Sequence, residues 1–158
     1  MRIENRLQLQ LWREECKEKH QKEKCRILVC GGTGCLAGGS DKIYARFKEM
    51  SEGMDHVTVK IGEEIAHPGV KMSGCHGFCE MGPLVRIEPY NYLYLKVKLE
   101  DCEEIFEKTI LRGEPVERLM YHDDHKVYET QEEIPFYAEQ TRLVLKNCGH
   151  IDAEHIEE

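Results

Sequence analysis

The sequence lacks three features that would each assign it to a common class. No apolar run comes near the roughly 20 residues that a membrane-spanning helix needs, so we expect no membrane segment. There is no G-x-G-x-x-G motif, and therefore no sign of a dinucleotide site. There is also no C-x-x-C motif, the spacing used by thioredoxin-type redox centres and by structural zinc knuckles.

Basic charge is scarce as well. The chain has 30 Asp and Glu residues against 22 Lys and Arg, and the net charge of −8 argues against nucleic acid or an anionic membrane as a partner. The first residues carry too many charges for a signal peptide, so we expect a cytoplasmic protein. In that reducing compartment, eight clustered cysteines bind metal or do redox work more often than they form disulfides.

Periodicity predicts an α/β fold. Apolar residues at helical spacing indicate helices over about 4–20, 41–52 and 101–112. Short apolar or alternating runs indicate strands over 26–30, 57–61, 84–87 and 92–99. The Gly-rich stretch 62–83 reads as a long functional loop. A β-α-β unit followed by a hairpin and a helix is the layout of a thioredoxin-like domain, with a four-stranded mixed sheet and flanking helices.

The expected organisation has three parts. They are an N-terminal helix (1–24), the thioredoxin-like domain (25–113), and a linker with an extended C-terminal tail (114–158). The tail regains apolar residues after a polar stretch but has no core of its own. We therefore expect it to dock on a further module, on a second copy of the chain, or on its own domain.

Two Cys-Gly segments carry the chemistry. In "CGGTGC" at 30–35, four residues separate Cys30 from Cys35, and in "CHGFCEMGP" at 75–83, three residues separate Cys75 from Cys79. Both loops leave a β-α-β unit at the same end of its sheet, so the four sulfurs can converge. Four converging thiolates suit either an iron–sulfur cluster or tetrahedral zinc.

The glycines in these loops favour the cluster. A two-iron, two-sulfide centre with four thiolates carries a net charge of about −2 when oxidised, and closely approaching backbone N–H groups stabilise it. Glycine permits that approach because it has no Cβ atom. The residues concerned are Gly31, Gly32, Gly34, Gly74 and Gly77. Two alternatives stay open: a zinc-stabilised subunit-docking module, and a thiol–disulfide oxidoreductase on the same fold.

The same residues carry a resemblance. C-x4-C, a gap near 40 residues, and C-x3-C followed by Gly-Pro resemble the thioredoxin-like [2Fe-2S] ferredoxin family, which includes a subunit of NADH:quinone oxidoreductase. The segments "GPLVRIEP", "YLYLKVKLED", "LRGEPVERL" and "PFYAEQTRLVLKNCGHID" resemble the N-terminal region of the flavoprotein subunits of multimeric and electron-bifurcating [FeFe]-hydrogenases. There the domain precedes an NADH- and FMN-binding module.

The resemblance implies a [2Fe-2S] cluster held by Cys30, Cys35, Cys75 and Cys79. It implies a one-electron carrier domain without a complete active site, which acts with flavoprotein or hydrogenase subunits of a cytosolic NAD(P)-linked hydrogenase or NADH dehydrogenase-type complex. The sequence has no flavin or NADH motif after the tail, so we expect either a piece of a longer subunit or a free-standing small one. In isolation we expect the apolar tail to form a homodimer or to stay mobile.

The remaining candidate ligands have simpler interpretations. We expect Cys102 and Cys16 to pack on apolar helix faces, and Cys25 and Cys148 not to be ligands. We expect His76 to be an exposed neighbour of the cysteine site. The "HDDH" run at 122–125 is expected to be a solvated part of the linker.

Overall fold

The structure of the protein is a computed structural model that describes residues 2–22, 25–52, 59–61, 64–66 and 68–156. The strands are β1 (Cys25–Cys30), β2 (Val59–Ile61), β3 (Glu64–Ala66), β4 (Pro68–Ser73), β5 (Val85–Glu88), β6 (Tyr92–Tyr94), β7 (Tyr121–His122) and β8 (Val127–Tyr128). The helical segments are α1 (Arg6–Lys22), α2 (Thr33–Ala37), α3 (Ser40–Glu52), η1 (Cys79–Met81), α4 (Asp101–Ile105), its π-helical continuation η2 (Phe106–Ile110), η3 (Glu117–Leu119), η4 (Gln131–Glu133) and α5 (Pro135–Ala138).

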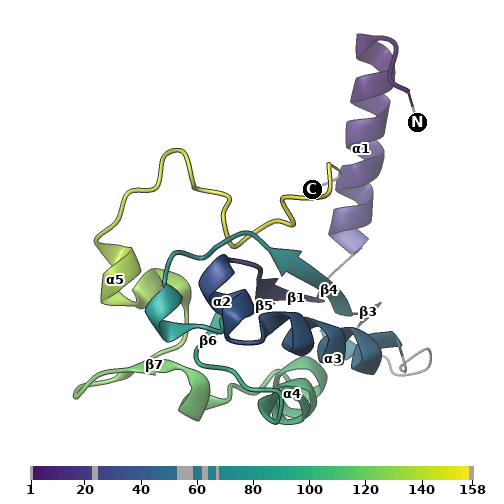
Figure 1. Cartoon of the computed structure of the whole chain (residues 1–158). Helices are drawn as coiled ribbons and strands as arrows, with labels where there is room; N and C mark the ends of the chain where they lie inside the picture. Colours follow the sequence, from purple (N-terminus) through teal and green to yellow (C-terminus); the bar gives the residue numbers. More distant parts are fainter. Residues whose placement is uncertain (1, 23–24, 53–58, 62–63, 67, 157–158) are drawn as a thin grey trace.

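The central sheet is mixed and has four strands in the order β4-β1-β5-β6. β1 runs parallel to β4 and antiparallel to β5, and β5 forms a hairpin with β6. Helices flank this sheet, as Figure 1 shows. The predicted fold class, an α/β thioredoxin-like sheet with flanking helices, is confirmed.

The prediction for the second parallel strand is wrong. The alternating pattern predicts this strand at 57–61, but the parallel partner of β1 is β4, which lies inside the predicted loop 62–83. Of the predicted strand, residues 59–61 form β2, which pairs with β3 in a separate two-stranded sheet, and residues 57 and 58 lie outside the described residues. The alternating pattern was therefore read correctly as a strand but given the wrong partner.

The two faces of β1 bury different clusters, because side chains alternate along a strand. Cys25, Ile27 and Val29 face α3 and α4 in the larger cluster, where Phe47 and Ile105 are fully buried. Cys30 faces the other side and belongs to a second cluster. That cluster joins Cys35, Leu84, Leu93, Leu95, Tyr128, Ile134 and Tyr137. The second cluster thus lies where the predicted cysteine loops leave the sheet.

The segment after 113 contributes to both clusters. Val116, Leu119 and Met120 pack in the larger cluster, and Tyr128, Ile134 and Tyr137 in the second. Of the docking sites expected for the linker and tail, residues 116–137 thus pack on the chain's own domain. The polar run at 122–125 is the turn of the β7–β8 hairpin, in which the Asp123 carboxylate accepts backbone hydrogen bonds from His125 and Lys126.

The N-terminal helix forms as predicted. α1 projects from the body of the molecule in Figure 1, and most of its side chains are exposed. Among the described residues, no helix combines the length and the apolar character that a membrane crossing needs.

Candidate metal centre

The first cysteine loop is fixed to the ends of two strands. Cys30 is the last residue of β1, and the N–H of Gly31 donates to the Ser73 carbonyl at the end of β4, at 2.9 Å. Cys35 lies in α2, a single helical turn that begins directly after Gly32. The glycine-rich sequence predicts a loop over this stretch, and the structure instead has a short helix. This helix holds the Cys35 side chain inward, where it is buried.

The second loop places two exposed thiols above the buried pair. The Sγ atoms of Cys75 and Cys79 are 4.0 Å apart, and Cys79 begins the η1 turn. The N–H of Gly77 donates to the Cys75 Sγ at 3.3 Å. Register pairing of Cys30 with Ser73 puts both loops at one end of the sheet, as the β-α-β argument requires.

Two glycines let the loops come together. A Cβ atom on Gly32 would lie 2.9 Å from the Cys75 Sγ and 3.5 Å from the Cys30 Sγ. A Cβ atom on Gly82 would lie 2.7 Å from the Cys35 Sγ. The separations of 2.9 Å and 2.7 Å are shorter than carbon–sulfur contact allows, so a larger residue at either glycine would displace Cys75 or Cys35. The backbone thus packs directly against three of the four sulfurs.

The local electrostatics stabilise a thiolate within this group. The pKa of the Cys30 thiol is lowered to about 6, because its sulfur accepts a hydrogen bond from the Cys35 thiol and others from the backbone N–H groups of His76 and Gly32. The pKa of Cys35 is raised, because that thiol donates to Cys30 and is buried. Burial also raises the pKa of Cys75. Backbone donors of this kind stabilise negative sulfur.

The donor set fits an iron–sulfur cluster. The site offers four cysteine thiols and no carboxylate. Thiolates are soft ligands, which suit iron–sulfur clusters and zinc. In the part of the chain that the structure describes, no three or more His, Cys, Asp or Glu side chains are already grouped as ligands of a metal ion. The two exposed thiols and the two buried thiols instead lie as neighbouring pairs, and a two-iron cluster takes two thiolates on each iron.

The prediction that His76 is exposed is wrong. Its exposed fraction is 0 %, and its ring bridges two segments. The Ser73 hydroxyl lies 2.9 Å from Nε2, and the Gln131 side-chain oxygen lies 3.2 Å from Nδ1. Burial, with the charges of Arg86, His150 and Arg142 nearby, lowers the pKa of His76 to about 4, so the ring is neutral near pH 7.

A buried arginine supports this anchor. Arg86 on β5 is 4 % exposed and donates to the Gln131 oxygen at 3.4 Å and to the Asn91 side-chain oxygen at 2.9 Å. Its Nη1 also lies 3.4 Å from a carboxylate oxygen of Glu132. Gln131 therefore accepts from both His76 and Arg86, which fixes the hydrogen on Nδ1 of the histidine ring.

The C-terminal segment 139–152, here called the strap, lies against the second cysteine loop. Arg142 donates to the His76 carbonyl at 2.7 Å, and the N–H of Gly74 donates to the Ile151 carbonyl at 3.2 Å. Gly149 is buried against the His76 ring. Beside the strap, Phe136 stacks on Phe78 of the loop, with ring centroids 4.3 Å apart. No local pattern in the sequence indicates these partners, because they are 55–77 residues away along the chain.

The burial predicted for Cys102 and Cys16 is confirmed. Cys25, Cys102 and Cys16 are buried, and burial raises the pKa of both Cys25 and Cys102 to about 12. Cys148 lies on the strap near Gly74. The structure thus brings together the four cysteines named from spacing, while the role of each as a ligand stays a prediction.

Known proteins show the same combination of sequence and fold. The model of the thioredoxin-like [2Fe-2S] ferredoxin family matches residues 17–109. A 2Fe-2S ferredoxin of Aquifex aeolicus is 50% identical over 86 residues, which cover 54% of this chain and 71% of that protein. A 2Fe-2S ferredoxin of Clostridium pasteurianum is 32% identical over 98 residues, which cover 61% of this chain and 94% of that protein.

Solved structures agree with this match. The structure of a thioredoxin-like [2Fe-2S] ferredoxin from Aquifex aeolicus superposes with a TM-score of 0.51 at 30% identity, over 61% of this chain and 89% of that one. A cysteine-to-serine variant of the protein from that organism gives a TM-score of 0.51 at 29% identity, over 63% of this chain and 99% of that one. Because the family model covers residues 17–109 of 158, the chain belongs to the thioredoxin-like [2Fe-2S] ferredoxin family.

Proposed function

We propose that Cys30, Cys35, Cys75 and Cys79 hold a [2Fe-2S] cluster and that the protein is a ferredoxin-type one-electron carrier. The family supports the cofactor and the electron-carrier role. The observation that carries the ligand assignment is that the two loops converge, with the Gly32 and Gly82 backbones against the cysteine sulfurs. A bound cluster would accept and release one electron at a time without bond chemistry on a substrate.

The protein's own part is to hold the thiolates and to balance their charge. The N–H groups of Gly32, His76 and Gly77 point at cysteine sulfurs. Such donors favour the charged form of sulfur and thereby raise the reduction potential of a cluster bound there. The His76 ring and the strap keep the second loop in place, so these donors stay aimed at the sulfurs.

The test is anaerobic purification followed by a visible spectrum and by iron and sulfide analysis. We expect a red-brown protein with bands between about 400 and 600 nm and about two irons and two sulfides per chain. The Cys75→Ala variant should lose both, while Cys102→Ala, which removes a buried thiol of the larger apolar cluster, should keep them. A colourless protein with one zinc per chain, or with free thiols alone, would support the zinc or the thiol–disulfide alternative instead.

For the setting, the proposal is a cytoplasmic protein that works with flavoprotein or hydrogenase subunits of an NAD(P)-linked hydrogenase or NADH dehydrogenase-type complex. The quoted sequence segments support it, together with Leu143, Val144, Leu145 and Ile156, apolar side chains that stay exposed on and after the strap. In isolation these side chains would pair two copies of the chain. Light scattering should then show a dimer that Val144→Glu converts to a monomer; a monomeric unmodified chain would contradict this part of the proposal.

A further inference from the structure

A groove beside the cysteine site is lined by three lysines. It has a volume of about 370 Å³, and Lys42, Lys96 and Lys98 are its charged lining residues; no carboxylate is among the described residues that line it. Neither Lys42 nor Lys96 is in an ion pair with another described residue. The chain as a whole has a net charge of −8, so the sign of this surface is opposite to that of the whole chain. We call it the lysine groove.

Backbone contacts build the groove onto the second cysteine loop. The N–H of Lys96 donates to the Met81 carbonyl at 2.9 Å, and the N–H of Val97 donates to the Pro83 carbonyl at 3.1 Å. Lys96 has a φ of 49°, so the chain turns sharply after β6 and runs beside residues 81–83. The strip 96–98 therefore lies against the residues that follow Cys79, and Lys42 faces it from α3.

One glycine separates the groove from a sulfur. Gly82 is part of the groove wall, and its backbone packs so closely on Cys35 that a Cβ atom there would lie 2.7 Å from the Sγ. Electron-transfer rates fall steeply with the distance between donor and acceptor. A molecule seated in the lysine groove would thus have a short path, through the Gly82 backbone, to the cysteine site.

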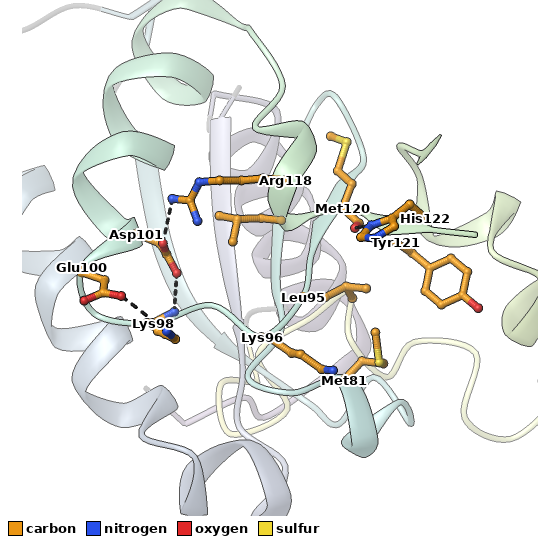
Figure 2. A pocket seen from close by; sticks show the side chains of 11 residues that line it. Met81, Leu95, Lys96, Lys98, Glu100, Asp101, Arg118, Met120, Tyr121 and His122 are labelled. Carbon is orange, nitrogen blue, oxygen red and sulfur yellow. Dashed lines mark hydrogen bonds and ion pairs between the residues drawn. The ribbon is translucent and has the colours of Figure 1, made fainter. Parts of the chain in front are cut away.

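The adjacent hollow offsets the charge of one of the three lysines, Lys98, whereas Lys42 and Lys96 have no carboxylate partner among the described residues. Figure 2 shows that hollow, which has a volume of about 400 Å³ and also receives Lys96 and Lys98. It includes two carboxylates, and each is held by a cation: Glu100 lies 3.5 Å from the Lys98 ammonium, and Asp101 accepts from Arg118 at 2.7 Å. Lys96 extends beside Met81 (Figure 2).

We propose that the lysine groove binds a carboxylate-rich segment of a redox partner protein, and that one electron passes between the partner's cofactor and the cysteine site at this contact. The inference rests on the proposed function, because it needs a redox centre at the cysteines. The electron donor is oxidised by one electron and the acceptor is reduced by one electron. No proton is transferred, and no bond forms or breaks. Opposite charges across such a contact steer encounter and fix its orientation.

The size and lining of the groove indicate a short acidic segment. Ile43, Pro83 and Leu99 give it an apolar floor, and Leu99 is 51 % exposed, so aliphatic stems of Glu or Asp side chains can pack there. A long polyanion such as nucleic acid would extend past the groove onto a surface whose balance is acidic.

The test measures how charge in the groove affects electron transfer to a small anion. The dithionite-reduced holoprotein is mixed anaerobically with the cobalt(III)–EDTA anion, which takes one electron and becomes cobalt(II)–EDTA, while visible absorbance follows the protein. At low ionic strength, Lys42→Glu and Lys96→Glu should each lower the second-order rate constant about fivefold. Added salt should remove the difference. A hexaglutamate peptide should slow the unmodified protein and leave the two variants nearly unaffected.

Lys48→Glu is the matched control, because Lys48 lies on the same helix, outside the groove, and the substitution makes the same change in net charge. If Lys48→Glu slows the reaction as much as Lys42→Glu, or if hexaglutamate has no effect, the lysine groove is not the contact. With the cobalt(III) hexaammine cation, the groove variants should show no loss of rate. A protein that purifies without iron would overturn the proposed function itself, whereas iron-loaded variants with unchanged rates would overturn this inference alone.

Discussion

The two ends of β1 each carry a buried cysteine, and the two thiols have opposite properties. Cys25 opens the strand with an exposed fraction of 0 %, and Cys30 closes it with 1 %. Burial, with the negative charge of Glu88, raises the pKa of Cys25 to about 12. The pKa of Cys30 is lowered to about 6, chiefly by the hydrogen bond from Cys35.

The difference teaches that burial alone does not decide the chemistry of a thiol. Both side chains are withdrawn from water, but Cys30 receives hydrogen bonds from Cys35 and from two backbone N–H groups. Cys25 lies instead among apolar side chains of the larger cluster. Donors favour the thiolate and an apolar surrounding disfavours it. One strand thus carries a packing thiol at one end and a thiol suited to bind metal at the other.

The largest expected effect comes from exchanging each of these two cysteines for alanine. Cys30→Ala should remove the visible bands and reduce bound iron from about two per chain to near zero, because a cluster needs all four thiolates. Cys25→Ala should keep the iron and lower the free energy of unfolding by about 1–2 kcal/mol, because it leaves a small cavity. Iron analysis and thermal unfolding of both variants would measure this. Retention of the cluster in Cys30→Ala, or its loss in Cys25→Ala, would remove the distinction between the two ends.

An intermediate effect is expected at His76, whose buried ring links Ser73 to Gln131 and so holds the second cysteine loop. His76→Ala leaves the side chains of Ser73 and Gln131 without this partner in a buried position. Unpaired buried polar groups destabilise by about 1–3 kcal/mol, which corresponds to roughly 2–12 °C in Tm for a chain of this size. Bound iron should also be lost faster to a chelator. The comparison variant is His122→Ala, since His122 is exposed and its ring contacts only a backbone carbonyl among the described residues. Equal Tm values for the two variants would show that the ring is not an anchor.

The smallest effect concerns pH. The pKa of Cys25 rises from an ordinary 9.0 to about 12 on folding, so above pH 9 the unfolded chain loses a proton that the folded chain keeps. Stability from this group is therefore complete below pH 9 and declines as pH rises toward 12. Between pH 9 and 10 the decline amounts to about 1 kcal/mol. Urea unfolding at pH 9 and pH 10 should show a smaller decline in the free energy of unfolding for Cys25→Ala than for the unmodified chain. Equal declines for the two proteins would contradict the raised pKa of Cys25.

The sequence predicted most of the sheet but not its return strand. β1, α3 and β5 have strong periodic or apolar patterns, and they formed within a few residues of the expected bounds. β4 was missed because "PGVKMS" begins with Pro and Gly and has few apolar residues. Its identity depends on pairing with β1, a long-range property that local propensity does not encode. The predicted strand over 92–99 also ends early, because Lys96 takes a left-handed conformation.

The cysteine site could be predicted because its key residues occur in the sequence as two closely spaced pairs of cysteines. Spacing named Cys30, Cys35, Cys75 and Cys79, and the structure brings their loops together. The residues that hold the loops in place could not be predicted from the sequence. Gln131 and Arg142 are polar residues in polar stretches, and nothing nearby in the sequence distinguishes them from solvated side chains. Their role follows only from the way residues 131–152 fold back onto the second cysteine loop.

That fold-back has a consequence for how the protein is made. The second cysteine loop is held by Gln131, by Arg142 and by the carbonyl of Ile151, whereas Cys30 and Cys35 are synthesised more than a hundred residues before the last of these. On the ribosome, the four thiols therefore emerge well ahead of the segment that fixes their geometry. Because contacts of long sequence separation form late, we expect the chain to pass through a stage in which its thiols are exposed to solvent and not yet covered by the strap. Cluster delivery in the cell is then best timed after the strap has folded back onto the second cysteine loop, which makes the strap a checkpoint of maturation.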